Sequence, residues 1–366
     1  MKLTLNKSNF EVILNNFQSF LDKKDATNIT SHIYLETIDE KLLLKATDYE
    51  IGIQSKIDIL NKIEDGIATV EGKKILDIVK NLKEGEIILE TNDEKSELIV
   101  KQTHPREAKF KLKTFNAAEF NSSTKFPEIS SNETKINLDS QNFIHSLKKV
   151  TVAADTNNQK MELTGTLIDV KDYHCNFVAT DTRRLAIIHH DTQSIGSQLS
   201  IIIPKRAIGE IFKLFYEDFE IYFSTTILFI KSHNYIFFTK LINGKYPDYE
   251  KIIPKDFKIE LKFPKTEIIE SIRLINSLST NVKITFTSEG ITFESMNIDE
   301  SESANTQIKL PLSITEPITL GMNSKYILDF LAHIDSSEFS IFINEPNTPF
   351  LLKDNNYSTI IMPVLC

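Results

Sequence analysis

Hydrophobic residues recur in the first part of the chain at the spacing of an amphipathic helix. The polar segment Asn6-Lys7-Ser8-Asn9 can cap such a helix. Five apolar residues then fall on one helical face: Phe10, Ile13, Leu14, Phe17 and Leu21. Short apolar runs follow, among them Ile33-Tyr34-Leu35 and Leu42-Leu43-Leu44, and such runs are typical of strands. The pattern therefore predicts a helix that leads into a sheet.

The same succession returns 133 residues later. Three features share this offset (179 − 46 = 133 for the first): Ala46-Thr47-Asp48 with Ala179-Thr180-Asp181, Phe10 with Phe143, and Ile75 with Ile208. The second apolar stripe is Phe143, Leu147, Val150 and Ala154. Because three independent features have one offset, chance is a poor explanation, and the chain contains an internal repeat.

Each copy also predicts a second amphipathic helix, at residues 73–82 and 205–215. A third, looser copy begins near Pro264, with a stripe at Ile268, Ile272 and Ile275 and a hairpin that turns at Gly290. Polar, turn-rich stretches at 120–132 and 247–256 separate the copies as linkers or exposed loops. We therefore expect an α+β fold of three repeated domains, at 1–126, 127–255 and 256–366.

Composition narrows the classes of protein. The 366 residues suit two or three domains, and 41% hydrophobic with 25% charged residues is usual for a soluble globular protein. The short apolar runs are interrupted by charge, and the N-terminus alternates like a strand, so neither a membrane span nor a signal peptide is expected. Cys175 and Cys366 are the only cysteines, which favours a reducing cytoplasm without disulfides or a cysteine metal site. The net charge of −9 argues against coating of nucleic acid by bulk attraction.

Enzyme signatures are weak. His189-His190-Asp191 is a candidate metal or acid/base cluster, but neighbouring residues of a strand point to opposite faces, and no third ligand follows at helical zinc spacing. The sequence has no glycine-rich phosphate loop and no nucleophile elbow. From these residues we expect no metal and no cofactor, and an enzyme that uses this cluster is the weakest of the alternatives.

Basic residues recur on the predicted helices, whereas strands elsewhere carry many of the acids. If the helices line one surface, that surface is basic although the whole chain is acidic, and its cations would contact phosphates without reading sequence. For any single lysine, a solvated helix face is an equally good interpretation. The candidate DNA contacts on the helices are Lys73, Lys74, Lys148, Lys149, Lys205 and Arg206.

A tight turn at Thr180-Asp181-Thr182 separates two apolar strands and presents Arg183 and Arg184 beside an apolar wall. By itself this pattern favours an ordinary hairpin with solvated arginines. A turn that places two guanidinium groups beside apolar residues also suits the docking of a peptide. The residues alone leave both interpretations open.

At this point the chain resembles the bacterial DNA sliding clamp, the beta subunit of DNA polymerase III. The resemblance rests on four segments, together with length and element order over the whole chain: residues 46–50, Ala179-Thr180-Asp181 with Arg184-Leu185-Ala186, residues 240–249 and Met362-Pro363. It implies a head-to-tail homodimer, a ring whose helices line a hole around duplex DNA and whose antiparallel sheets lie outside. It also implies a processivity factor without catalytic activity of its own. A peptide-binding α+β scaffold that never encircles DNA remains the alternative.

The resemblance further implies a groove in which the replicative polymerase, the clamp loader and repair proteins dock short linear motifs. Apolar residues such as Leu163, Leu185, Ile252, Ile360 and Met362 would form its floor, and Arg184, Asn323 and Tyr326 a polar rim. The residues of the implied groove are Leu163, Thr180, Thr182, Arg183, Arg184, Leu185, Pro247, Lys251, Ile252, Asn323, Tyr326, Pro349, Ile360, Ile361, Met362 and Pro363.

Several positions depart from the family pattern. The family usually has Gly-His where this chain has Thr182-Arg183, and an arginine is common at the position of Lys251. The C-terminus reads Met362-Pro363-Val364-Leu365-Cys366 and lacks the arginine that many members carry there, and residues 276–281 lack an aromatic. We therefore expect partner peptides that differ in sequence preference or affinity.

DNA and dimer contacts are also implied. The family's DNA positions correspond to Lys24, Asn157, Met161 and Glu162, of which Lys24 suits phosphate and Glu162 would repel it. The dimer contact would pair Phe110 and Leu112 of one chain with Leu274 and Ile275 of the other. Ordinary sheet or helix core is the alternative for these four apolar residues.

Overall fold

The described residues form two compact units, each assembled from two separate stretches of the chain. The computed structural model describes residues 1–25, 27–131, 133–136, 138–171, 173–191, 198–296 and 302–365. One unit comprises residues 1–141 with 209–241, and the other 142–208 with 242–366. Cys366, and Asn132 of the expected linker, lie outside the described residues.

The first unit contains two antiparallel sheets. One has the strand order β5-β1-β7-β8-β9 and the other β10-β15-β16-β17-β4-β3-β2-β6. The strands of the first sheet are β1 (Lys2–Asn6), β5 (Asn61–Glu64), β7 (Glu86–Thr91), β8 (Glu97–Gln102) and β9 (Ala108–Lys113). Those of the second are β2 (His32–Ile38), β3 (Lys41–Thr47), β4 (Ile51–Asp58), β6 (Ile67–Glu71), β10 (Thr134–Ile136), β15 (Glu220–Phe223), β16 (Ile227–Lys231) and β17 (Tyr235–Lys240).

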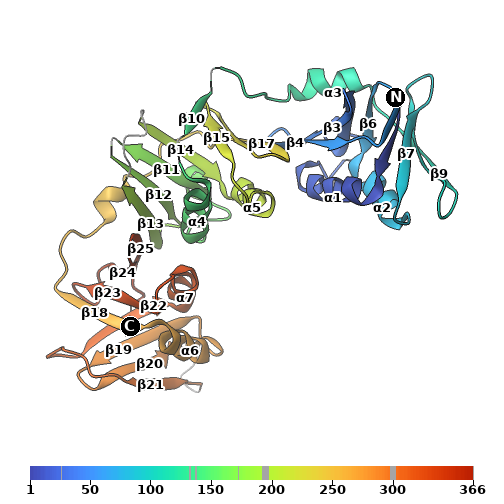
Figure 1. The fold of residues 1–366 in the computed structure, drawn as a ribbon. Coiled ribbons are helices and arrows are strands. Elements are labelled where there is room, and N and C mark those ends of the chain that lie inside the picture. Colours follow the sequence, from blue (N-terminus) through green and yellow to red (C-terminus); the bar gives the residue numbers. More distant parts are fainter. Residues whose placement is uncertain are drawn as a thin grey trace. The chain divides into compact units, whose positions relative to one another are not determined.

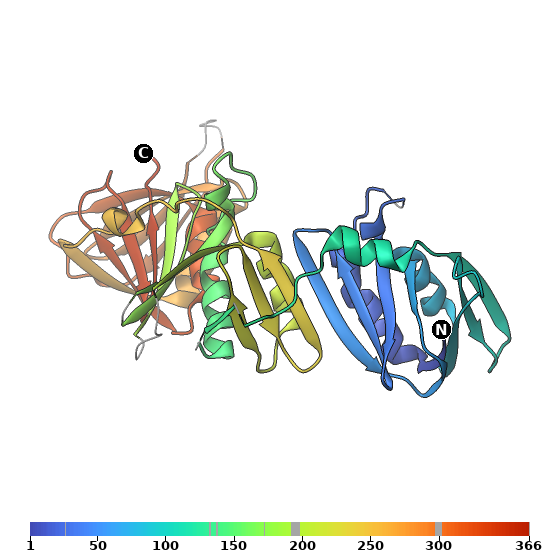
Figure 2. The same ribbon diagram turned by 90° about the horizontal axis from the view of Figure 1, so that it is seen from above.

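The helices of this unit pack on both sides of the strands. Helices α1 (Lys7–Phe17) and α2 (Gly72–Asn81) lie side by side, and α3 (Ala117–Thr124) lies on the other side of the strands (Figures 1 and 2). The predicted stripe is buried, but only Phe10 to Phe17 lie on α1, and Leu21 follows the helix in an extended conformation. The Asn6 side chain caps the helix by accepting from the Asn9 amide at 3.1 Å. Short 3-10 turns follow at η1 (Gln18–Phe20) and η2 (Ile29–Ser31).

The second unit also contains two antiparallel sheets, with orders β14-β11-β12-β13-β25-β24-β23-β18 and β21-β20-β19-β22. The strands of the larger sheet are β11 (Gly165–Lys171), β12 (His174–Thr180), β13 (Arg184–Asp191), β14 (Leu199–Pro204), β18 (Ile259–Pro264), β23 (Glu338–Ile343), β24 (Phe350–Asp354) and β25 (Tyr357–Ile361). Those of the smaller are β19 (Asn281–Thr287), β20 (Gly290–Ser295), β21 (Asn305–Lys309) and β22 (Ile318–Asn323).

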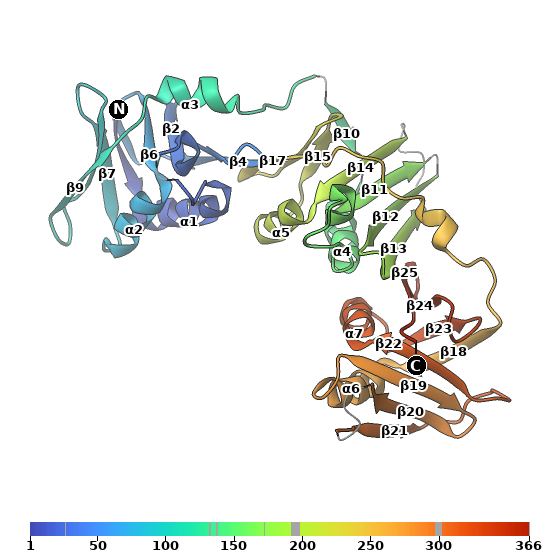
Figure 3. The same cartoon turned by 180° about the vertical axis from the view of Figure 1, so that it is seen from behind.

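Helices α6 (Lys265–Asn276) and α7 (Ser324–His333) of this unit lie side by side (Figure 3). Helix α7 contacts β22, and α6 contacts β19, β20 and β21. The second-copy helices α4 (Ser140–Thr151) and α5 (Lys205–Leu214) each contain residues of both units, and η3 (Met161–Thr164) and η4 (Tyr249–Ile252) are short turns. No helix among the described residues combines the length and the hydrophobicity that a membrane span requires.

The repeat predicted from the sequence is visible in the elements. Strands β3 and β4 and helix α2 have their counterparts 133 residues later in β12, β13 and α5. The repeats do not coincide with the compact units, because sheets continue from one repeat into the next: β17 pairs with β4, and β13 pairs with β25. The α+β class with antiparallel sheets is confirmed, whereas the boundaries after residues 126 and 255 stay predictions.

The expected linker at 120–132 is wrong in its first part. Residues 120–124 belong to α3, whose N-terminus is capped by the Asn116 side chain through the Ala118 amide at 3.0 Å. Phe120 is fully buried, and its ring stacks on that of Tyr34 with centroids 5.3 Å apart. A single large aromatic that packs on a strand outweighs the polar composition of its neighbours.

Candidate functional site

The candidate site is built on the turn between β12 and β13. Thr180 Oγ1 donates a hydrogen bond to the Arg184 carbonyl oxygen at 2.6 Å. The Asp181 carboxylate accepts from the amides of Arg183 and Arg184, each at 3.0 Å. Short Thr and Asp side chains bond neighbouring backbone in this way, as the sequence predicts. The turn therefore fixes the backbone from which both arginines extend.

The first repeat contains the same turn between β3 and β4. Thr47 Oγ1 donates to the Ile51 carbonyl at 2.8 Å, and the Asp48 carboxylate accepts from the Ile51 amide at 3.0 Å. The position of Arg184 is taken here by buried Ile51. The scaffold is thus shared by both copies, and a buried arginine distinguishes the second.

Both turns pass through the left-handed region at their third residue. Thr182 has φ 73° and Tyr49 has φ 75°. Positive φ is uncommon for a residue with a Cβ atom and is especially unfavourable for a β-branched residue. Thr182 therefore occupies a strained backbone position that a glycine would occupy without strain.

Arg184 is buried, with 6% of its surface exposed, and all parts of its guanidinium group are engaged. Nε lies 3.1 Å from Asp181 Oδ2, and Nη1 lies 2.7 Å from Asp329 Oδ2. Nη2 donates to the Val152 carbonyl at 2.5 Å, and the group stacks on the Tyr326 ring at 4.6 Å from its centroid. The prediction that Arg184 forms a polar rim is wrong, because this cation is held inside the fold by two carboxylates.

Helix α7 supplies the other polar residues that the sequence places here. The Asn323 side chain caps the helix by accepting from the Lys325 amide at 2.9 Å. Tyr326 is half-buried, and burial raises the pKa of its hydroxyl. Sequence reasoning missed Asp329, the second partner of Arg184. The available signal was an arginine at a position where the first repeat has a core isoleucine, because a buried cation requires a partner.

Strand β25 runs antiparallel beside β13 and brings the C-terminal residues to the turn. Leu185 is opposite Ile360, and Arg184 is opposite Ile361. Beyond the strand, the Met362 amide donates to the Arg183 carbonyl at 2.9 Å. Residues separated by almost half the chain therefore adjoin. They belong to the implied groove: Thr180, Thr182, Arg183, Arg184, Leu185, Ile360, Ile361, Met362 and Pro363.

The same stretch is bordered on its other side by β24. Phe350 is opposite Ile361, which places Pro349, the residue before β24, level with Met362. Pro363 follows directly, and the Val364 amide then donates to the Gly321 carbonyl of β22 at 2.8 Å. The C-terminal segment is thereby tied to both sheets of its unit.

Leu185 and Ile360 face one apolar cluster that also contains Tyr246 and Tyr249. Pro247, between the two tyrosines, and Ile252, in the turn that follows, therefore lie in the segment that covers this cluster. Neighbouring Lys251 is exposed and forms an ion pair with Asp248 at 2.7 Å. The apolar floor is only partly continuous: Leu163, Leu185 and Ile360 are buried, whereas Ile252 and Met362 are exposed.

Leu163 lies in η3, which approaches the same covering segment. A Cβ atom at Gly244 would lie 3.6 Å from Glu162 Oε2, so residue 162 adjoins the chain just before Pro247. The Asp155 amide donates to the Leu163 carbonyl at 2.9 Å and closes the loop that precedes η3. The structure thus places Leu163 at the edge of this region without a described contact to Leu185.

Comparisons with known proteins match the whole chain. Models of the DNA polymerase III beta subunit match its N-terminal domain at residues 1–124, its central domain at 137–248 and its C-terminal domain at 250–365. The chain belongs to this family. The beta sliding clamp of Helicobacter pylori strain J99 is 37% identical over 381 residues, with 100% of each chain covered.

Solved structures agree. The H. pylori beta clamp bound to a DNA ligase peptide is 38% identical and has a TM-score of 0.91, with full coverage of both chains. The DNA polymerase III subunit beta of Pseudomonas aeruginosa is 21% identical, has a TM-score of 0.89 with full coverage, and supports the fold alone. The three repeats and the α+β architecture expected from the sequence are those of the sliding-clamp family.

The basic residues proposed to contact DNA differ in how far their side chains are exposed. Lys148 and Lys149 are adjacent on α4, but only Lys148 is exposed. Lys149 is 4% exposed, and its Nζ lies 2.7 Å from Asp335 Oδ2 and over the Tyr357 ring. The prediction that Lys149 contacts DNA is therefore wrong, because its side chain is buried and its charge is paired with that of the exposed Asp335.

The side chain of Lys205 also has a hydrogen-bond partner within the protein. Its ammonium donates to the Ala154 carbonyl at 2.6 Å, and burial lowers its pKa. Its neighbour Arg206 is exposed, as is Asn157, whose amide donates to Asp155 Oδ1 at 3.1 Å. Within the second unit, fewer of the candidates have exposed side chains than the sequence suggests.

In the first unit, Lys24 and Lys73 border one hollow of about 590 Å³ together with Lys23. Both are exposed, and so is Lys74, which forms an ion pair with Glu71. The hollow also contains carboxylates, so it is mixed in charge rather than purely basic. These lysines remain candidates for phosphate contacts.

The four residues expected at the dimer contact divide into exposed and buried ones. Leu274 of α6 is 63% exposed, and Phe110 of the edge strand β9 is also exposed. Leu112 is half-buried. Ile275, however, is 1% exposed and belongs to the core, as the alternative interpretation had it. Neighbouring positions of a helix point in different directions, so Leu274 and Ile275 do not share one surface.

The histidine cluster is split between two faces of β13. His190 Nε2 lies 2.6 Å from Ser146 Oγ on α4, whereas His189 Nδ1 lies 2.8 Å from Asn176 Oδ1. Within the described part of the chain, no three His, Cys, Asp or Glu side chains gather as a metal site requires. Cys175 is buried, which raises the pKa of its thiol to about 12.

Proposed function

We propose that the chain acts as a DNA sliding clamp through a partner surface at the junction of β13 and β25. The observation that carries this is the adjacency of Leu185 with Ile360 and of Arg183 with Met362 in a chain whose three parts match the sliding-clamp family. Exposed Met362 and Arg183 flank the buried pair, so a docked peptide has apolar and charged groups to contact. Such surfaces take most of their affinity from a few anchors.

A related protein supports the binding of peptides. The H. pylori beta clamp has been solved with a bound DNA ligase peptide. For this chain we infer short linear motifs of the replicative polymerase, the clamp loader and repair proteins as ligands. Their preference will follow Thr182 and Arg183, because the permanent charge of an arginine selects different peptides from those that a histidine selects.

We further infer a head-to-tail homodimer that closes around duplex DNA. The free edge of β9 with exposed Phe110, and exposed Leu274 on α6, are surfaces suited to contact between copies. A heterologous contact of this kind forms a ring when its rotation closes. DNA inside the ring would be contacted at phosphates by Lys24, Lys73, Lys74, Lys148 and Arg206, irrespective of sequence. We place the protein in the cytoplasm and assign it no catalytic activity.

Retention on closed and open DNA tests this proposal. Clamp loaded on nicked circular DNA should persist at a salt concentration that removes it from short linear duplex, because a ring leaves linear DNA at the ends, whereas phosphate contacts weaken with salt on both. Linearising the circle should release the protein. Simultaneous loss from both substrates at one salt concentration would support the scaffold that binds peptides without encircling DNA.

A further inference from the structure

Strand β18 forms one edge of the larger sheet of the second unit. Among the described residues it pairs only with β23 in that sheet, and Ile259 to Pro264 are opposite Ile343 to Glu338. Just beyond the strand, the Lys265 amide donates to the Ser337 carbonyl at 2.8 Å. Because bonding to one partner alternates along an antiparallel strand, the backbone groups of Glu260 and Lys262 point away from β23.

The counterpart of β18 in the first repeat is β1. Each strand leads directly into a helix, α1 or α6, and each pairs on one side with an antiparallel strand, β7 or β23. The Lys7 amide donates to the Gly85 carbonyl at 2.9 Å, as Lys265 does to Ser337. Counted from these helix starts, Lys262 corresponds to Thr4.

The two strands differ on their other side. The outer edge of β1 is covered by β5, with Thr4 opposite Asn61 and the Leu60 amide donating to the Thr4 carbonyl at 2.9 Å. Strand β5 contains four residues, Asn61–Glu64. In the first repeat, therefore, the outer edge of β1 accepts a short antiparallel strand, and the Thr4 carbonyl receives one of its hydrogen bonds.

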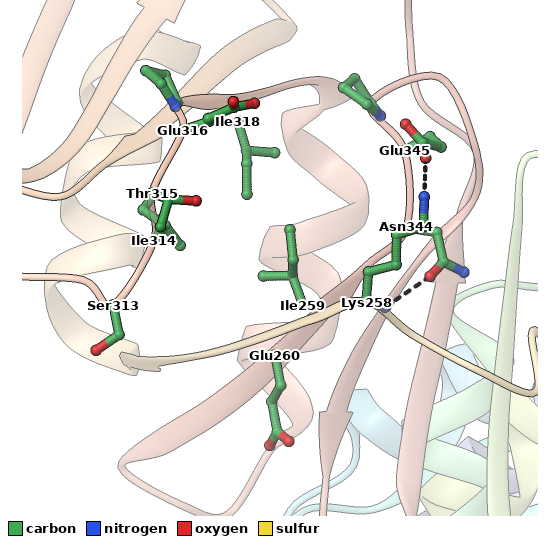
Figure 4. Close-up of a pocket in the computed structure, with 12 residues that line it drawn as sticks. Lys258, Ile259, Glu260, Ser313, Ile314, Thr315, Glu316, Ile318, Asn344 and Glu345 are labelled. Atoms are coloured by element: carbon green, nitrogen blue, oxygen red, sulfur yellow. Dashed lines mark hydrogen bonds and ion pairs between the residues drawn. The ribbon is translucent and has the colours of Figure 1, made fainter.

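In the third repeat the corresponding edge borders a hollow of about 670 Å³ (Figure 4). Ile259 of β18 and Ile318 of β22 point toward one another across it. Three carboxylates and one ammonium are among the lining groups: Glu260, Glu316, Glu345 and Lys258. Lys258 forms an ion pair with Glu345, so the remaining charge of the lining is negative.

We propose that this edge and hollow bind an extended, basic segment of a partner protein, which adds to the sheet as a strand beside β18. The backbone groups of Glu260 and Lys262 that face away from β23 would pair with the segment as Thr4 pairs with β5. An apolar side chain of the segment would lie between Ile259 and Ile318, and a lysine or arginine would face Glu316. This surface is separate from the one formed by β13 and β25.

The segment that pairs with β1 in the first repeat suggests a synthetic peptide with which to test the proposal. We would use a capped peptide with the sequence of residues 59–64 but with lysine in place of its final glutamate, and a second peptide with glutamate at both charged positions. Titration calorimetry with the full chain should show saturable binding of the basic peptide and weaker binding of the acidic one. The C-terminal deletion of residues 362–366 should bind the basic peptide as the intact chain does. Absence of saturable binding, or its loss in that deletion, would overturn the proposal.

Two variant pairs separate backbone pairing from charge. Lys262→Pro removes an amide that faces away from β23 and should abolish binding, whereas Lys262→Ala keeps the amide and should bind normally. Glu316→Lys should lower the affinity for the basic peptide about threefold to fivefold, as expected for one exposed ion pair. Glu316→Gln should lower this affinity by less. Circular dichroism checks that each variant folds. Normal binding by folded Lys262→Pro excludes strand addition, and an unfolded Lys262→Pro leaves the Glu316 pair to decide.

Discussion

Arg184 and Asp329, 145 positions apart in the chain, form an ion pair in which Nη1 lies 2.7 Å from Oδ2. The pair ties the turn after β12 to helix α7, and Asp181 and the Val152 carbonyl complete the environment of the guanidinium group. This arrangement makes the arginine a structural support of the partner surface, where the sequence suggests a solvated or rim residue. Substitution there should affect stability before it affects peptide contacts.

Arg184→Ala should lower the free energy of unfolding by about 2–4 kcal/mol, because the partly buried Asp181 carboxylate loses its cation and Asp329 keeps only its ion pair with Lys325. Arg183→Ala is the matched control on the neighbouring, exposed residue, and should change stability by no more than about 0.5 kcal/mol. Scanning calorimetry of both variants measures the difference. Equal stabilities would show that the buried ion pair contributes nothing net.

Thr182→Gly should stabilise the protein by about 0.5–1 kcal/mol, because relief of the strained φ exceeds the entropy that glycine gains in the unfolded chain. The Thr182 amide, which donates to Thr180 Oγ1 at 3.1 Å, is retained. Tyr49→Gly in the first repeat is the parallel test at the same φ. A loss of stability at position 182 would mean that the Thr182 side chain makes favourable contacts that outweigh the strain.

Deletion of residues 362–366 should abolish docking of short-motif peptides derived from the replicative polymerase without dissociating the dimer, since Met362 adjoins Arg183 at the proposed partner surface. Leu185→Ala should make the free energy of peptide binding less favourable by about 1–3 kcal/mol if Leu185 is a central anchor. Replacing Thr182 and Arg183 by Gly and His should change which peptides bind rather than whether any bind. Calorimetry measures each affinity. Unchanged binding by the deletion would place the partner surface elsewhere.

Leu274→Asp should convert the dimer into folded monomers at a cost of several kcal/mol, because an unpaired carboxylate would be buried at the contact. Val12→Asp is the control, since Val12 is also an exposed apolar residue of a helix but lies outside the expected contact. Light scattering of both variants reports the mass in solution. A dimeric Leu274→Asp protein would refute this assignment of the interface.

Lys148→Ala should weaken binding to short linear duplex and reduce the slope of log affinity against log salt by up to about 1, because one phosphate contact is lost. Lys149→Ala should leave that slope unchanged and instead lower the melting temperature, because Asp335 loses its buried partner. Binding measured at several salt concentrations, with calorimetry alongside, distinguishes the two lysines. A reduced slope for Lys149→Ala with an unchanged slope for Lys148→Ala would show that Lys149, rather than Lys148, contacts DNA.

The sequence by itself determined the features that local chemistry encodes. The helical stripes, the three repeats and the Thr-Asp turn could be predicted, since each depends on spacing or on side chains that bond nearby backbone. The stripe from Phe10 to Phe17 and the turn at Thr180 to Arg184 are found as expected, whereas Leu21 is buried but lies beyond the end of the helix. The sequence also showed that Thr182 replaces the glycine usual in the family, although the backbone strain at Thr182 became apparent only from its φ angle.

Only the tertiary structure decided which side chains are exposed and can therefore contact DNA or another protein. Lys148 and Lys149 are alike in sequence, and so are Leu274 and Ile275, yet one residue of each pair is buried. Burial depends on partners far away in the chain: Asp335 is 186 residues from Lys149, and Asp329 is 145 from Arg184. The free edge of β18 likewise follows from strand order, which periodicity does not encode. Long-range pairing is chosen by packing of the whole unit, and no local pattern records it.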